Sequence, residues 1–364
     1  MAAKIGVKFI SKKVSKTRWQ PETFQNDNDI FATGSWDNNV NEIEVWSLPK
    51  MSHLTTEVAD PEYVCGCDHI GDVTELKFVG ANRLLASSST GSVTLYQLQT
   101  RSKTLTLDQR WEKLHTLCGK GSACTSIVVN GSDFITTGED GSLKVLRMGQ
   151  QEPVRSMDCA DSCCINAAVQ VKNHEIVTAN SRGQLKQWDL RQPGNQPVNI
   201  FLLTGEQSGL VSVDRHPSQA HVVAAGGEDG CLNVWDLRQQ KYPATLFTSH
   251  DGPVWDVCFH QSSPDHLFTC SNDGSLLHWD NSSTSLHSSS ILASHGLPEH
   301  PPHTERSSVS CSWLSGETGQ SDVQINSLLP PSTMSINCFD ILGQNIVCGT
   351  DGEAVYFLYG INTR

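Results

Sequence analysis

The sequence predicts an all-β fold, a closed ring of seven four-stranded blades, on three observations. One pattern recurs seven times in the 364 residues: a short run of small or β-branched residues, a tight turn, and an alternating strand. Each such strand carries a large residue, and these recur at intervals of 42–50 residues, or 78 for the last, near the ~40–45 residues of a propeller blade. No long segment shows the period of a helix. The large residues are Trp46, Tyr96, Leu146, Trp188, Trp235, Trp279 and Phe357.

The stretch GGEDGCLNVWDLR, residues 226–238, is one copy of the repeat, and its acidic residues suggest either a site or a turn. Asp-Gly between alternating runs predicts a hairpin, because glycine accepts positive φ and aspartate caps the turn. The same dipeptide recurs in other copies, and a catalytic pair is not expected in each of them. The predicted structural turns are Asp140-Gly141, Asp229-Gly230, Asp273-Gly274 and Asp351-Gly352.

The N-terminal segment is predicted to close the ring. The first recognisable hairpin begins near residue 31, which leaves a strand at 5–14 without a partner in its own repeat. We expect this strand to pair beside residues 346–358 in the last blade, since closure protects the open edges of the sheets.

The chain is expected to form a single seven-bladed domain, 1–364, with one insertion. Residues 281–323 are rich in Ser, His, Pro and Gly, a composition typical of functional or disordered loops, and lie before or within the last blade. Within them, 309–314 (VSCSWL) is expected to be a strand that returns to the seventh blade.

Composition excludes several classes of function. A net charge of −13 argues against nucleic acid or an anionic membrane as the main partner, and no apolar run approaches the ~18 residues of a membrane span. The 13 cysteines without a secretory signal predict reduced thiols in a nuclear or cytosolic protein. The basic residues within 1–20 are interpreted as a solubilising arm that also forms a strand, in preference to a docking arm for an acidic partner.

No enzyme motif is present, so neither catalysis, a cofactor nor a small-molecule substrate is expected. Two clusters contain metal-ligand residue types, Cys65-Cys67-His69 and His295-His300-His303. Neither has the spacing of a zinc site, so the first is interpreted as structural and the second as a solvated loop. A catalytic propeller would need convergent carboxylates in a deep central pocket.

The repeats resemble WD40 repeats, and the best copy is 249–280. In that family a histidine, a strand Ser or Thr, the turn Asp and the Trp form a hydrogen-bonded network within the blade. The resemblance assigns these roles to His250, Thr269 or Ser271, Asp273 and Trp279. It also implies a weaker copy with His69, Ser87 or Ser89, Thr90 and Tyr96, and it puts the fourth blade in doubt, where Arg182 replaces the turn Asp.

A more specific resemblance extends from end to end. Residues 10–21, 31–38, 213–230, 263–280 and 327–356 are similar to a WD40 family of scaffold nucleoporins. This resemblance implies a non-enzymatic subunit of the Y-shaped complex at the nuclear envelope. Its partners would be other nucleoporins of that complex, on the arm that carries nucleoporin eighty-five. It also implies roles in protein and mRNA transport and in pore assembly, and at kinetochores in mitosis.

An alternative is a substrate receptor of a cullin-RING ubiquitin ligase. QWDLR at 187–191 and VWDLR at 234–238 match the Trp-Asp-x-Arg box of such receptors, although Asp and Arg also suit a surface ion pair. The residues that contact a partner are not identified by sequence. Aromatic residues outside the repeat are candidates, with core packing as the alternative for each: Trp19, Trp36, Trp111 and Trp313.

Overall fold

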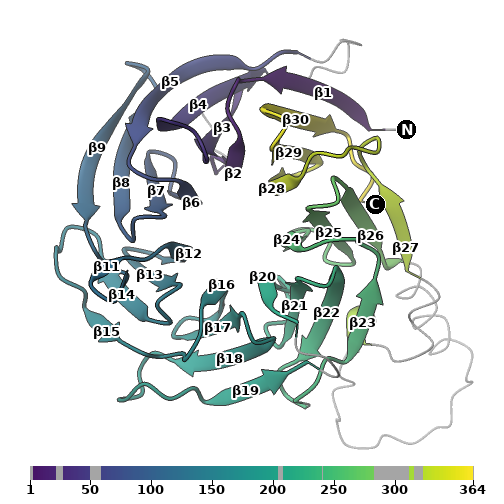
Figure 1. Ribbon diagram of the computed structural model, residues 1–364. Coiled ribbons are helices and arrows are strands. Elements are labelled where there is room, and N and C mark those ends of the chain that lie inside the picture. The colour runs from purple at the N-terminus through teal and green to yellow at the C-terminus, as the bar shows by residue number, and fades with distance from the viewer. Residues whose placement is uncertain are drawn as a thin grey trace, which may run out of the picture.

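In the computed structural model, each repeat forms a four-stranded antiparallel sheet, and the sheets form a ring (Figure 1). Residues of the innermost strands, such as Lys16, Glu75 and Asp256, line a central channel. The structure describes residues 3–21, 28–49, 59–203, 208–239, 241–282, 311–314 and 323–363. Within these residues there are seven such blades, as the spacing of the repeats predicted. In six blades the strands pair in chain order, so the first lines the channel and the fourth lies at the rim; in blade seven the rim strand comes from the N-terminus.

Blade one contains β2 (Val14–Trp19), β3 (Asn28–Ser35), β4 (Asn41–Pro49) and β5 (Glu62–His69), and blade two contains β6 (Val73–Val79), β7 (Arg83–Ser88), β8 (Val93–Gln99) and β9 (Thr104–Trp111). Blade three contains β12 (Cys124–Asn130), β13 (Asp133–Gly138), β14 (Leu143–Arg147) and β15 (Arg155–Met157), and blade four contains β16 (Ile165–Lys172), β17 (Glu175–Asn180), β18 (Gln184–Asp189) and β19 (Asn199–Leu202). Blades five and six contain β20 (Leu210–Arg215), β21 (Val222–Gly227), β22 (Cys231–Asp236) and β23 (Thr245–Thr248); and β24 (Val254–Phe259), β25 (His266–Ser271), β26 (Leu276–Asp280) and β27 (Gln324–Ser327). Blade seven contains β28 (Ile336–Leu342), β29 (Asn345–Thr350), β30 (Ala354–Tyr359) and β1 (Lys4–Phe9).

The ring is closed by the two ends of the chain. β1 pairs antiparallel with β30, from Lys4 opposite Tyr359 to Phe9 opposite Ala354, so the predicted closing strand is confirmed. It is shorter than the expected range 5–14, because Ser11 turns the chain in the left-handed region (φ 57°) towards blade one.

The predicted turns join the second and third strands of their blades. Gly141, Gly230 and Gly274 have φ of 69°, 81° and 81°, and a Cβ atom at Gly230 would collide with the carbonyl oxygen of His250. In the blade-seven turn the left-handed residue is Glu353 (φ 56°) instead of the glycine before it.

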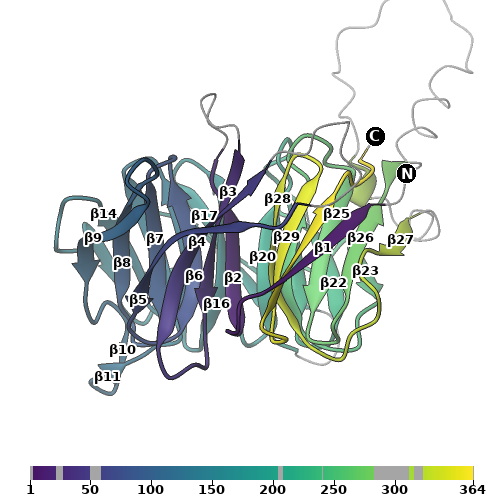
Figure 2. The same cartoon turned by 90° about the horizontal axis from the view of Figure 1, so that it is seen from above.

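Antiparallel strands alternate in direction, so the loops fall into two sets. The turns between second and third strands share one face with the connections from the fourth strand of one blade to the first of the next. We call this the turn face, and the other the opposite face. The hairpin of β10 (Thr116–Leu117) and β11 (Lys120–Gly121) protrudes from the turn face, at the bottom of Figure 2, whereas both termini lie towards the opposite face.

The apolar core lies between adjacent blades. Each cluster of buried residues draws on two neighbouring sheets; Trp279 of blade six, for example, is fully buried against Phe247 of blade five, with ring centroids 5.3 Å apart. Burial of this kind, worth ~25 cal/mol per Å² of apolar surface, stabilises each blade through its neighbours. No helix in the described part of the chain is long and apolar enough to span a membrane.

The insertion joins the third and fourth strands of blade six, because β26 ends at Asp280 and β27 begins at Gln324 in the same sheet. It therefore precedes the last blade. The predicted strand at 309–314 is wrong: Ser312–Leu314 is a 3₁₀ helix, η1. Trp313 explains the difference, since it packs on Phe259 of blade six and its Nε1–H donates to the carbonyl oxygen of Pro264 at 2.9 Å. Most of the insertion, including its three histidines, lies outside the described residues.

Candidate functional site: blade networks and loop faces

Blade six contains a continuous chain of hydrogen bonds. The indole Nε1–H of Trp279 donates to the hydroxyl of Thr269 at 2.9 Å, and Thr269 Oγ1 lies 2.7 Å from Nε2 of His250. On the other side of the ring, His250 Nδ1 lies 3.1 Å from Asp273 Oδ2 and 2.9 Å from the hydroxyl of Ser275. The structure thus brings together Thr269, and not Ser271, with the histidine and the tryptophan. Ser271 instead donates to the carbonyl oxygen of Gly252.

Burial decides the protonation of this network. Burial lowers the pKa of His250, so the ring is neutral at neutral pH and its contact with Asp273 is a hydrogen bond. Burial alone would raise the pKa of Asp273, but hydrogen bonds from Ser275 and from the backbone N–H of Asp251 hold it below its ordinary value. An ionised Asp273 can only accept, so Nδ1 carries the proton and Nε2 accepts from Thr269. Every polar side-chain group of this blade-six network is then satisfied, which rigidifies the blade.

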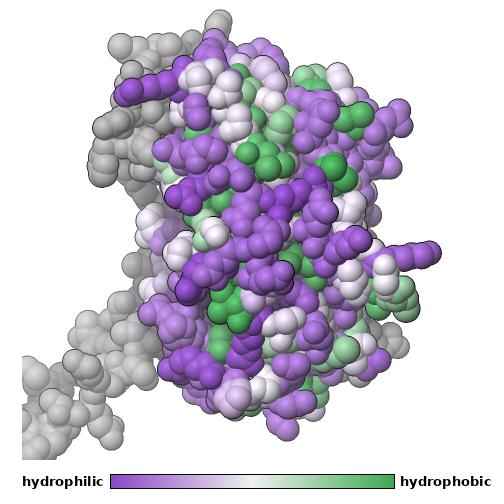
Figure 3. Space-filling view, turned by 90° about the vertical axis from the view of Figure 1, so that its left-hand side faces the viewer, coloured by the Kyte–Doolittle hydropathy of each residue, from purple (hydrophilic) through white to green (hydrophobic). Residues whose placement is uncertain are grey.

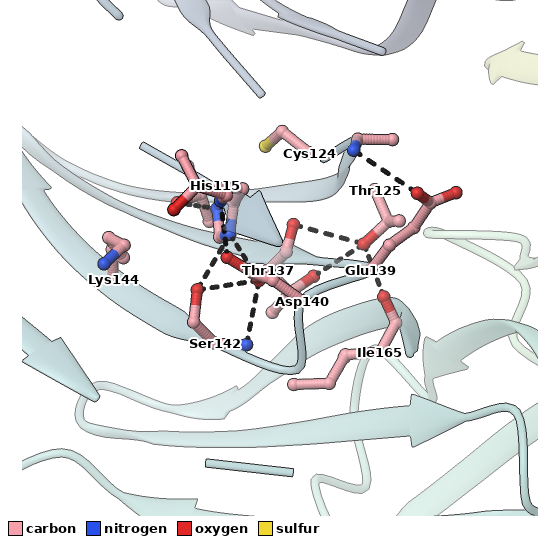
Figure 4. Close-up of polar contacts among 12 residues, drawn as sticks. His115, Cys124, Thr125, Thr137, Glu139, Asp140, Ser142, Lys144 and Ile165 are labelled. Carbon is pink, nitrogen blue, oxygen red and sulfur yellow. Dashed lines mark hydrogen bonds and ion pairs between the residues drawn. The ribbon is translucent and has the colours of Figure 1, made fainter. Parts of the chain in front are cut away.

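Blade three contains a second network, which sequence reasoning missed (Figure 4). His115 Nδ1 lies 3.0 Å from Asp140 Oδ1, and its Nε2 lies 2.9 Å from Thr136 Oγ1. Ser142 donates to Asp140 through both its backbone N–H and its hydroxyl. Leu146 stands at the tryptophan position, which hid the resemblance. The available signal was the histidine 25 residues before the turn Asp, close to the 23 residues between His250 and Asp273 in blade six.

Blade four replaces the missing turn Asp with other groups. The Nε1–H of Trp188 still donates to Thr178 at 2.9 Å. Asn180 accepts from the backbone N–H of Arg182 through its side-chain oxygen, and its amide donates to Asp161 at 2.9 Å. With Arg182 at the position of the turn Asp, blade four therefore keeps a polar network at this place, but with different partners.

Blade two follows the predicted weaker copy only in part. His69 Nδ1 lies 3.1 Å from the hydroxyl of Tyr96, while Ser89 accepts from the backbone N–H of Asp72. The hydroxyls of Ser88 and Thr90 pair with each other at 2.9 Å.

The basic N-terminal residues are neutralised within the ring, in agreement with their interpretation as a structural arm. Lys12 pairs with Glu42 at 2.6 Å, and Lys13 lies beside Asp37. Two others, Lys16 and Arg18, line the central channel from β2.

The channel gathers a charged cluster that sequence reasoning also missed. Arg18 pairs with Glu75 at 2.8 Å and lies 3.7 Å from Asp256. Burial alone would raise the pKa of Glu75, but the guanidinium of Arg18 outweighs it and holds the pKa at about 2. The cluster also includes Asp340, which accepts from the backbone N–H of Trp19. Its members come from inner strands of several blades, so no local pattern connects them.

Three of the four candidate anchor tryptophans fill the core. Trp19, Trp111 and Trp313 are buried, and only Trp36 is half-buried, on the turn face. The Nε1–H of Trp36 donates to Asp351 at 3.1 Å, which joins the turns of blades one and seven. An exposed partner surface must therefore be sought among other side chains.

The Asp and Arg of the two Trp-Asp-x-Arg boxes form local ion pairs on the opposite face. Arg191 pairs with Asp189, and Arg238 with Asp236, each with two hydrogen bonds of 2.8–3.0 Å. Such exposed ion pairs contribute little to stability, and they give the Asp and Arg of each box a local role that needs no partner.

The Cys65-Cys67-His69 cluster has no metal-site character. Burial raises the pKa of the Cys67 thiol to about 12, which disfavours the thiolate that binds metal. Among the described residues, no group of three His, Cys, Asp or Glu side chains is placed to hold a metal ion.

Comparisons with known proteins agree with this architecture. Residues 196–236 and 241–280 match the family model "WD domain, G-beta repeat". The chain is 43% identical to human nucleoporin Nup43 and 43% identical to the mouse protein, each over 97% of both chains. It is 22% identical to nuclear pore complex protein nup43 of Dictyostelium discoideum, over 96% of this chain and 98% of that one.

The closed ring of seven sheets and the matched repeats define the chain as a WD40-repeat β-propeller. At 43% identity over nearly its whole length, the chain belongs to the Nup43 family of nucleoporins.

Proposed function

We propose that this chain is a non-enzymatic scaffold subunit of the Y-shaped complex of the nuclear pore, at the nuclear envelope. The observation that carries the proposal is the end-to-end identity with nucleoporin Nup43, which includes segments outside the generic repeat. A relative with only the fold in common would match the blades and not those segments. Because β1 completes blade seven, the ring needs no strand from a partner to close, and its loop faces and rim are the surfaces left for docking.

More specifically, we propose that the chain docks on the arm of the Y-shaped complex that carries nucleoporin eighty-five. There it would support protein and mRNA transport and pore assembly, with a further role at kinetochores in mitosis. A docked propeller face of this kind typically buries ~1,200–2,000 Å² in total, with a few side chains supplying most of the affinity.

Purification of the native protein with its stable partners tests the proposal. We expect Y-complex nucleoporins at equal stoichiometry, identified by mass spectrometry, with nucleoporin eighty-five among them. Recovery of a cullin-ligase adaptor without nucleoporins would overturn the proposal in favour of the ligase receptor. The control is Arg191→Ala with Arg238→Ala, which removes both boxes and should leave nucleoporin recovery unchanged.

A further inference from the structure

Among the described loops, negative charge is concentrated on the turn face. The described loops of this face carry thirteen acidic and five basic residues. The described loops of the opposite face carry three acidic and five basic residues. The turn-face acids are Asp37, Asp72, Glu112, Glu139, Asp140, Asp158, Asp161, Glu228, Asp229, Asp251, Asp273, Asp351 and Glu353, and the bases are Lys12, Lys13, Lys113, Lys120 and Arg182.

The same face carries a group of exposed apolar side chains on one side only. Each has more than half of its surface exposed, and they belong to blade seven, blade one and the connections into blades two, three and seven. We call them the apolar arc: Phe9, Val40, Ile70, Leu117 and Met334. In the described turn-face loops from Asp158 to Ser275, which serve blades four to six, no large hydrophobic side chain is exposed to this degree.

Direct contacts join the turn-face loops of blades seven and one that carry part of the arc. Met334 lies beside Gly352, and the residue after Phe9 donates its backbone N–H to the carbonyl oxygen of Glu353 at 2.9 Å. From blade seven, the bond of Asp351 with Trp36 leads into the turn of blade one.

Hydrogen bonds and close contacts also link the turn-face loops of blade one to those of blade two. The backbone N–H of Asp37 donates to Asp72 at 2.9 Å, which ties the turn that holds Val40 to the loop that holds Ile70. That loop abuts Thr90, and the backbone N–H of His115 donates to the carbonyl oxygen of Gly91 at 3.2 Å, under the hairpin that carries Leu117.

The fold requires neither the excess of acidic residues on the turn face nor the exposed side chains of the apolar arc. Exposed apolar side chains contribute nothing to the core, and a cluster of them bordered by charge marks an interaction site. On the side of the ring shown in Figure 3, by contrast, apolar side chains are scattered among hydrophilic ones. The blade networks account for Asp140, Asp161 and Asp273, but several other acids, such as Glu228 and Glu353, are exposed without a role in a network.

We propose that the apolar arc is the docking surface for a basic amphipathic segment of a partner nucleoporin, whose apolar side chains cover the arc and whose Lys and Arg face the surrounding carboxylates. The inference rests on the proposed function and specifies which face carries it. Charge complementarity selects a basic segment over an acidic one, and it speeds encounter at low salt.

The test uses the full chain and the reconstituted Y complex that lacks it. We compare the unmodified chain with Ile70→Lys/Leu117→Lys on the arc and with Val198→Lys/Tyr242→Lys on the opposite face. All four positions are exposed, so unchanged thermal unfolding shows that the variants fold. The arc variant should lose affinity at least about tenfold, because two apolar contacts are replaced by charges that repel the basic segment, and the control should bind normally. Binding by the unmodified chain should weaken as salt is raised.

The outcomes separate the two proposals. If the unmodified chain binds and the arc variant binds equally well, the docking surface is elsewhere and the scaffold function stands. If the unmodified chain does not bind the reconstituted complex, the scaffold function itself fails, and this inference with it. A photoreactive residue at position 70 identifies the segment: cross-links to a Lys/Arg-rich stretch support the proposal, and cross-links to an acidic stretch overturn it.

Discussion

Blades five and six present the same tryptophan in two polar environments. Trp235 and Trp279 are both fully buried and occupy equivalent positions in β22 and β26. Trp279 donates to Thr269, whereas Ala225 stands at the Thr269 position in blade five. As a result, the Nε1–H of Trp235 has no hydrogen-bond partner among the described residues, and neither has the side-chain amide of the buried Asn233.

The comparison shows that apolar packing is enough to form a blade and that the hydrogen-bond network is an addition to this packing. Blade five pairs its four strands in the usual register without the histidine or the threonine, so apolar burial between sheets is sufficient for the fold. The polar network matters once a donor is buried, because an unsatisfied group costs ~1–3 kcal/mol. Blade five, which carries one of the two Trp-Asp-x-Arg boxes, thus has the less satisfied tryptophan.

Truncation of the two tryptophans should separate these contributions most strongly. Trp279→Ala should lower the free energy of unfolding by ~3–5 kcal/mol, since it opens a cavity and breaks the network. Trp235→Ala opens a similar cavity but removes a donor that had no partner, so it should cost less. Urea unfolding of both variants measures the difference; equal costs would show that the network contributes nothing to stability.

Acid should weaken blade six through its own histidines. His266 Nδ1 lies 2.9 Å from His278 Nε2, so one nitrogen must donate and the other accept, and protonation of the accepting nitrogen breaks the pair. Burial and the neighbouring His266 lower the pKa of His278 to about 4. The histidine pKa is higher in the unfolded chain, 6.5, so between pH 6.5 and about 4 the unfolded chain binds more protons than the folded chain. The pair's contribution is complete above pH 6.5 and is lost as the pH falls towards 4.

Unfolding by urea between pH 7.5 and 4.5 tests this loss. His278→Gln, which stays neutral, should show a flatter dependence on pH than the unmodified chain. Hydrogen exchange should show β26 losing protection before β22, which has no histidine. An identical pH dependence in the variant would assign the acid loss to other groups.

Removal of one hydroxyl should give the smallest effect. Thr269→Val keeps the shape of the side chain but deprives both Trp279 and His250 of a partner, so it should cost ~1–3 kcal/mol. Thr248→Val, at an exposed position of β23, is the matched control and should stay within about 0.5 kcal/mol. A cost for Thr269→Val no larger than that of the control would contradict the network.

Much of this architecture could be predicted because its signals are local. The turn and the alternating strand lie within about fifteen residues of each other in each copy, and seven copies fix the number of blades. The network of blade six was predicted from the resemblance to WD40 repeats, whose pattern His250, Asp273 and Trp279 keep. The network of blade three was missed because Leu146 replaces the tryptophan on which the pattern depends, although His115 and Asp140 kept their places.

The sequence by itself determined the repeat, the blade number and the need for a closing strand, because strand and turn preferences act over a few neighbouring residues. Only the tertiary structure decided which loops share a face, which side chains meet in the channel, and that Trp313 packs on Phe259 instead of continuing a strand. Those contacts join residues tens to hundreds of positions apart, and the packing of blades against one another, together with closure of the ring, brings them within bonding distance. Arg18 meets Glu75, and Trp36 meets Asp351, for that reason.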